Sequence, residues 1–211
     1  MRGLTAWIAA MGLTVFMAAC QQPDVPRDHF YRLDPGTPSA FSAPALPGTL
    51  EVERFTAVGL TSQRPVVYSE ADAANQAFAY HYHFWEESPG AMLQDRMVDY
   101  LRAAKIANNV VTPDLRTNAD YVVTGRIQRL EQVRSGGTKL QKVLGENGSA
   151  KGVLEIELVL RRAKDDTLLH HGIYRHDMAA EGSSVAQSVA ALNQCLSKAY
   201  SSFLDEIKTK K

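Results

Sequence analysis

Residues 151–162, KGVLEIELVLRR, alternate between apolar and polar side chains more regularly than any other part of the sequence. One face of this stretch is apolar and consists of Leu154, Ile156, Leu158 and Leu160. The opposite face carries Glu155, Glu157 and Arg161. A period of two with one apolar face predicts a strand that is buried on one side. The aspartates at 165 and 166 then predict a turn into residues 167–178 as a hairpin partner.

The same patterns extend outward from this hairpin to the rest of the chain. Helices are predicted from Ser88 to about Lys105 and after Ser183 or Ser184, because apolar residues recur there at helical spacing. The glycine-rich residues 136–149 predict a turn region. Further strands are predicted at residues 49–55, 64–70, 76–85, 108–113 and 119–133. The order β-β-β-α-β-β-β-β-α predicts an α+β fold, a two-layer sandwich of a mostly antiparallel sheet with two helices on one face.

Residues 77–93, AFAYHYHFWEESPGAML, contain an unusual number of rings. Aromatic side chains occupy every second position, at Phe78, Tyr80, Tyr82 and Phe84. His81, His83 and Trp85 have the opposite phase. One interpretation is that this set forms the core face of a strand and packs against the helices. The other is that part of the row, or Trp85 at its end, is a contact surface for a partner or an acyl chain.

The first twenty residues have the layout of a secretory signal: Arg2, a run without charges, and then Ala18, Ala19 and Cys20. A cysteine after two alanines resembles a bacterial lipobox. That resemblance implies cleavage before Cys20, a diacylglyceryl thioether on its sulfur and an acyl chain on its new amino group. The alternative is a signal peptide that is cleaved nearby and leaves Cys20 unmodified. Gln21 follows the cysteine, and the sorting rule of Gram-negative lipoproteins then implies the outer membrane.

Residues 20–48 are predicted to be the lipidated cysteine and a tether, and residues 49–211 a single domain. Six of the nine prolines fall between residues 21 and 48, a composition typical of extended linkers. Within this stretch Phe30, Tyr31 and Leu33 are more apolar than a linker requires, and we expect this piece to pack on the domain.

Composition excludes several classes of protein. Lys plus Arg equals Asp plus Glu, at 23 each, so no basic surplus points to nucleic acid. Cys20 and Cys195 are the two cysteines, and a lipidated Cys20 leaves Cys195 without a disulfide partner. Cys195 stands in an apolar helical pattern, which predicts a small buried side chain.

No strong catalytic or metal-binding motif is present in the sequence. His81 and His83 share one side of a strand, as two metal ligands would. A second group, His170, His171 and His176, falls in another strand, where His170 and His171 must point to opposite faces. A zinc site needs three or four ligands, and no Cys, Asp or Glu stands at ligand spacing. Hydrogen-bonding or solvated histidines are therefore the preferred interpretation over a metal site or a Ser-His-Asp site, and no cofactor or metal is predicted.

Three motifs in order resemble one known family: YRLDP at 31–35, RPVVYSE at 64–70 and YHYHFWEESPGAML at 80–93. With the lipobox, they are similar to the ABC-type transport auxiliary lipoproteins, the PqiC-like group that works with MCE lipid transport systems. The resemblance covers nearly all of the mature chain and is strongest from Arg64 to Leu101.

The resemblance implies a non-enzymatic, periplasm-facing subunit. Its partners would be an MCE protein, a permease and an ATPase, with phospholipid as cargo and a homo-oligomer as one arrangement. The densest aromatic cluster beside a turn supplies the predicted partner-binding residues, Tyr80, Tyr82, Trp85 and Pro89. Two other functions stay open at this point: an assembly lipoprotein of a secretion or pilus machine, and a small envelope hydrolase or metal-binding protein.

Overall fold

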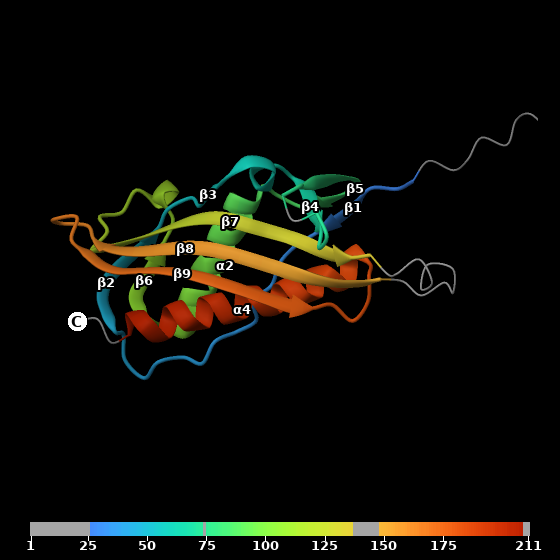
Figure 1. The fold of residues 1–211 in the computed structure, drawn as a ribbon. Coiled ribbons are helices and arrows are strands. Elements are labelled where there is room, and N and C mark those ends of the chain that lie inside the picture. The colour runs from blue at the N-terminus through green and yellow to red at the C-terminus, as the bar shows by residue number, and fades with distance from the viewer. Residues whose placement is uncertain (1–25, 74, 137–147, 209–211) are drawn as a thin grey trace, which may run out of the picture.

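The structure, a computed structural model, describes residues 26–73, 75–136 and 148–208 (Figure 1). The signal, Cys20 and most of the glycine-rich turn region lie outside these residues. Nine strands and two α-helices form the described part; the strands are β1 (His29–Tyr31), β2 (Leu46–Val52), β3 (Thr56–Ala57), β4 (Pro65–Glu70), β5 (Phe78–Trp85), β6 (Ala107–Val111), β7 (Tyr121–Ser135), β8 (Ser149–Arg162) and β9 (Leu168–Ala179). The helices are α2 (Pro89–Ala104) and α4 (Val185–Ile207), with short 3₁₀ turns η2 (Gly59–Ser62) and η3 (Pro113–Leu115).

Strand β7 organises the sheet. On one side it pairs antiparallel with β8 along its whole length, and β8 pairs antiparallel with β9, as the hairpin pattern predicts. Its other side takes three short strands one after another, β2, β3 and β4, all parallel to β7. Beyond β2 lies β6, and beyond β4 lie β5 and then β1.

The prediction of a mostly antiparallel sheet is wrong, because five of the eight strand pairings are parallel. Alternation of apolar and polar residues reports that one face of a strand is buried, and it carries no information about strand direction. Direction follows from the connections. The chain passes through β2, β3 and β4 in one direction along the same edge of β7, so all three are parallel to it.

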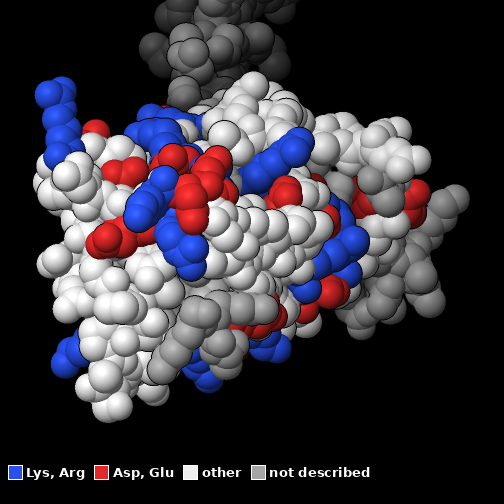
Figure 2. Space-filling model, turned by 90° about the vertical axis from the view of Figure 1, so that its left-hand side faces the viewer, with Lys and Arg blue, Asp and Glu red and all other residues white. Residues whose placement is uncertain are grey.

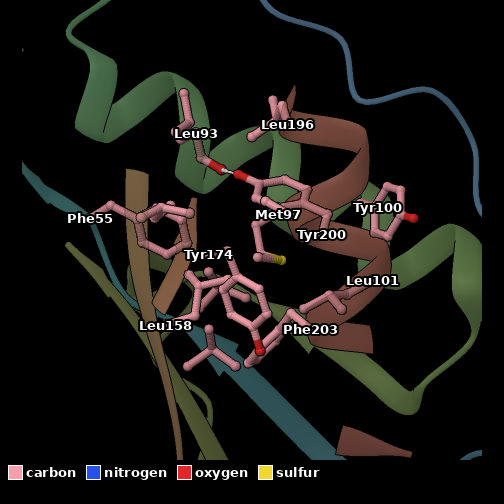
Figure 3. Packing of buried hydrophobic residues seen from close by; sticks show 14 of the residues in the cluster. Phe55, Leu93, Met97, Tyr100, Leu101, Leu158, Tyr174, Leu196, Tyr200 and Phe203 are labelled. Carbon is pink, nitrogen blue, oxygen red and sulfur yellow. Dashed lines mark hydrogen bonds between the residues drawn. The ribbon is translucent and has the colours of Figure 1, made fainter. Parts of the chain in front are cut away.

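Both helices cover the same face of the sheet, as predicted (Figure 1). Helix α4 begins with a capping box, in which Ser184 Oγ accepts a hydrogen bond from the Gln187 amide and the Gln187 side chain accepts one from the Ser184 amide. The helices meet where the Tyr200 hydroxyl donates to the Leu93 carbonyl at 2.7 Å. Figure 3 shows this contact inside the core, and further down in the same view the Phe203 ring lies beside Tyr174.

Part of the predicted tether lies on the domain. Strand β1 pairs with β5, Leu33 is fully buried in the core, and β2 already begins at Leu46. Between them the chain passes both helices, since the Asp34 amide donates to Asn193 of α4 and the Phe41 amide to the carbonyl of Ala104 in α2. The fold therefore includes the chain from about residue 29, ahead of the predicted boundary at residue 49, because β1 pairs with β5 and Leu33 is buried in the core.

Cys195 is fully buried, as its helical pattern predicts. Burial raises the pKa of its thiol to about 11, so the thiolate is disfavoured at neutral pH. In the described part of the chain, neither helix combines the length and the apolar composition that a membrane crossing needs.

Candidate interaction surface

Strands β1, β4 and β5 form the outer part of the sheet at the end where the chain enters the fold, and we call this part the aromatic wing (Figure 1). Within it, β5 contributes the predicted aromatic strand and β1 contributes His29, Phe30 and Tyr31. Parallel pairing places these three residues opposite His83, Phe84 and Trp85. The wing therefore gathers rings from both sides of the predicted tether boundary.

The pairing of β4 with β5 contains a large bulge. Pro65 lies opposite Phe84, while Val67 lies opposite Ala79. Five steps along β5 therefore span two steps along β4, so β5 holds three additional residues between these pairs. A bulge of this kind interrupts the alternation of a strand. Because of it, the aromatic row does not form one continuous core face.

Six rings of the wing are in contact from β1 to β4, and we call them the aromatic ladder: His29, Tyr31, Tyr68, Phe78, Tyr80 and His83. Ring centroids lie 4.5 Å apart for Tyr68 and Tyr80, and 5.2 Å apart for Tyr80 and His83. The remaining contacts, between 5.0 and 5.7 Å, join His83 to His29 and Tyr31, and Tyr68 to Phe78. Such separations are those of favourable aromatic pairs.

Hydrogen bonds fix the ladder to the rest of the fold. The Tyr80 hydroxyl donates to the side-chain oxygen of Gln132, which is fully buried on β7. The Gln132 amide donates in turn to Ser188 Oγ on α4 at 2.7 Å and to the Ser183 carbonyl at 3.1 Å. A buried amide with its partners in place is rigid and costly to disturb. The wing is thus tied to the start of α4 through one side chain.

Charge also enters the ladder at its β4 end. The Arg134 guanidinium lies over the Tyr68 ring, 4.4 Å from its centroid, and pairs with Glu70. This arrangement combines a cation–π contact with an ion pair.

The environment of the ladder shifts the pKa values of its ionisable groups. Burial, with a smaller effect of the neighbouring His29, lowers the pKa of His83. Burial raises the pKa values of both Tyr31 and Tyr80. The lowered pKa favours the neutral form of the His83 ring, whose Nδ1 lies 2.8 Å from the Tyr31 hydroxyl.

The four predicted partner-binding residues have very different exposures. Trp85 is 1% exposed and Pro89 is buried at the start of α2. Tyr80 is partly buried in the ladder, whereas Tyr82 is 41% exposed. Trp85 and Pro89 thus belong to the core because β5 ends where the sheet meets α2. Tyr82 remains available to a partner, and partner binding itself stays a prediction.

Exposed large apolar side chains gather on and beside the wing. Of eight such residues in the described chain, five belong to β1, to β5 or to the segment from the end of β3 through η2; they are Phe30, Val58, Leu60, Phe78 and Tyr82. Val58 and Leu60 lie in a short irregular segment without a period, so the sequence carries no signal for them. Phe30 stands out in the sequence only as unusually apolar for a linker.

The histidines do not form a metal site within the described residues. No group of three or more His, Cys, Asp or Glu side chains in that part of the chain could hold a metal ion. His83 is in the ladder, whereas His81 is exposed. His170 and His171 point to opposite faces as predicted: His170 lies 3.0 Å from Glu206 of α4, and His171 lies 2.8 Å from Glu157 on the open face.

Comparison with known proteins identifies the family. The model of the ABC-type transport auxiliary lipoprotein component matches residues 31–202. This chain belongs to that family. The match begins at Tyr31, within β1, and so includes much of the predicted tether.

Solved structures show the same fold at low sequence identity. A Xanthomonas campestris protein of the DUF330 family is 14% identical, with a TM-score of 0.68 over 86% of this chain and 95% of that chain. An uncharacterized protein, also 14% identical, gives a TM-score of 0.61 over 86% of this chain and 99% of its own. The search of curated proteins found no match.

The auxiliary lipoprotein is thus a transport-associated component of the cell envelope and not an enzyme. This agrees with the resemblance seen in the sequence. It also removes the small envelope hydrolase from the functions that the sequence left open.

Proposed function

We propose that this auxiliary lipoprotein is anchored in the outer membrane through Cys20 and docks the MCE component of an ABC-type lipid transport system there. The cargo would be phospholipid or a related hydrophobic molecule that passes between the membranes. Family membership supports the association with an ABC transporter. The lipobox and Gln21 support the anchor and its membrane.

Two exposed rings of β5, Phe78 in the ladder and Tyr82 outside it, are the observation that carries the docking proposal. Tyr82 and Phe78 present large ring surfaces to solvent, on a strand whose neighbouring ring, Tyr80, is held by Gln132. Binding energy at protein interfaces concentrates in aromatic side chains of this kind. A side chain on a fixed strand also loses little conformational freedom when a partner binds.

Site-specific crosslinking in cells tests the docking surface. A photoreactive phenylalanine at position 82 should crosslink to the MCE protein, because the native ring would lie in the interface. The same residue at position 115 is the control, since Leu115 is 58% exposed in η3, away from the wing. Equal crosslinking from both positions would contradict the choice of surface. Consistent recovery of a different envelope machine would contradict the MCE partnership itself.

A pull-down from membranes measures how much the same surface contributes to binding of the MCE protein. Tyr82→Ala should reduce recovery of the MCE protein several-fold, as truncation of an interface tyrosine commonly costs more than about 1 kcal/mol. Leu115→Ala should leave recovery unchanged. Both variants should be compared at matched amounts of lipidated protein, so that a loss of anchoring is not mistaken for a loss of docking.

A further inference from the structure

The face of the aromatic wing that points away from the helices is a second surface, distinct from the ladder. Side chains alternate along a strand, and Trp85 points into the core under the helices. Phe84 and its partner Phe30 therefore lie on the opposite, open face, where their rings stack with centroids 5.8 Å apart. Phe30 is 58% exposed, so the outer ring of this pair lies in solvent.

Neighbouring residues extend this surface and give it a basic component. The Arg64 guanidinium lies 5.6 Å from the centroid of the Phe30 ring and donates to the Trp85 carbonyl. The 3₁₀ turn η2 ends two residues before Arg64. Leu60 within η2 and Val58 just before it are exposed. We call Phe30, Val58, Leu60 and Arg64 the anchor-side surface.

The length of chain before β1 limits where this surface can be. His29 follows Cys20 by nine residues. A fully extended chain spans at most about 3.3–3.6 Å per residue, so β1 lies within about 30 Å of a lipidated Cys20. Phe30 is the second residue of β1. A surface that is exposed, aromatic and this close to the anchor is placed to meet the membrane.

The opposite end of the molecule has a different character. Figure 2 shows the end that lies on the left of Figure 1, where basic and acidic side chains stand side by side. Mixed charges of this kind suit water, whereas aromatic rings beside arginine suit the boundary between headgroups and acyl chains. Exposed aliphatic residues such as Leu168 also occur outside the wing, and it is the stacked aromatic pair beside Arg64 that distinguishes the anchor-side surface from this end.

We infer that the anchor-side surface rests on the bilayer that holds Cys20, with Phe30 and Leu60 in the headgroup boundary and Arg64 beside the lipid phosphates. The contact orients the domain on the membrane, so that Tyr82 has a fixed height above it. This inference rests on the proposed anchor at Cys20 and does not require the MCE protein.

Tryptophan fluorescence in vesicles tests this orientation without any partner. After cleavage at Cys20, Trp85 is the single tryptophan of the native chain, and its burial gives a constant background. The lipidated protein should be reconstituted in phosphatidylethanolamine–phosphatidylglycerol vesicles that contain lipids brominated in the acyl chains. Phe30→Trp and Leu60→Trp are the two probes, and Leu115→Trp is the control of equal or greater exposure.

The expected result is a blue-shifted emission and a loss of intensity for both probes in brominated vesicles, beyond the loss seen for the native protein and for Leu115→Trp. Quenching at positions 30 and 60 no greater than at position 115 overturns the inference. A blue shift at positions 30 and 60 that develops only when the MCE protein is added also overturns the inference, and it assigns this surface to the partner. Failure of docking at Tyr82 with quenching at both probes would reject the proposed function and keep the orientation.

Discussion

The meander of β7, β8 and β9 and the aromatic wing belong to one sheet but use their side chains in opposite ways. In the meander, alternate residues of β8 such as Leu158 are buried in the core, and the others form ion pairs such as Arg175 with Glu155 on the open face. In the wing, rings contact rings on both faces, and several large apolar side chains remain exposed. The meander also exposes Leu168 and Ile173, both aliphatic, whereas the exposed rings among these large apolar side chains, Phe30, Phe78 and Tyr82, all lie in the wing.

This comparison predicts its largest effect at the one residue of β5 that belongs to the core. Trp85→Ala should lower the free energy of unfolding by about 3–5 kcal/mol, the usual cost of emptying a large aromatic site. Tyr82→Ala, three residues earlier on the same strand, should change it by no more than about 0.5 kcal/mol, as at other exposed positions. Urea denaturation of the two variants measures both values. Similar losses of unfolding free energy for the two variants would show that Tyr82 is part of the core and not an exposed surface residue.

An intermediate effect is expected where the wing meets α4. Ser184→Ala removes the side-chain acceptor of the capping box and should cost about 1 kcal/mol of stability. The matched control is Ser201→Ala in the same helix, whose hydroxyl is exposed and bonds only to the Lys198 carbonyl. Thermal melts compare them directly. A smaller drop in melting temperature for Ser184→Ala than for Ser201→Ala would mean that the Gln132 contacts alone hold this end of the helix.

The smallest effect should be a pH dependence that arises in the ladder. Since burial lowers the pKa of His83 in the folded protein, the unfolded chain binds the proton more readily. Stability should therefore fall as the pH is lowered through about 6.5 and below, toward the folded pKa. His176, whose pKa burial also lowers, should contribute in the same direction.

Melting temperatures at pH 7.5 and 5.0 would measure this dependence for the native protein and for His83→Gln. The variant should lose less stability on acidification, although it is less stable at neutral pH because it lacks the Tyr31 contact. An unchanged pH dependence in the variant would assign the effect to His176 and to other groups.

The sequence was sufficient for features that depend on local patterns. The β8–β9 hairpin, both helices, a serine cap at 183 or 184 and the buried Cys195 all followed from residues close together in the chain, and the family followed from short motifs. Strand direction did not, because it depends on how β2, β3 and β4 line up along β7, far from them in the sequence. The burial of Trp85 could not be read from the pattern for a related reason: β5 ends where the sheet meets α2, and its last ring lies in the core.

The surface residues were harder still to predict. The bulge in β5 exposes Tyr82 and partly buries Tyr80, although the two share the same phase in the sequence. Phe30 and Leu60 lie in segments too short for a detectable period, and only the parallel pairing of β1 with β5 and the stacking of Arg64 on Phe30 bring them to one place. Such long-range contacts leave no local trace in a single sequence.

Strand β1 also determines how the domain responds to mechanical force. A pull on Cys20 from the membrane would reach the fold at His29 and act along the axis of β1, which is hydrogen-bonded to its parallel neighbour β5. Such a load shears the backbone hydrogen bonds together instead of opening them one at a time. Beyond β1, the buried Leu33 and the hydrogen bond from the Asp34 amide to Asn193 would bear any load that β1 passes on. Under the proposed anchoring at Cys20, the first residues of the fold would act as a shear-resistant coupling between the membrane and the core.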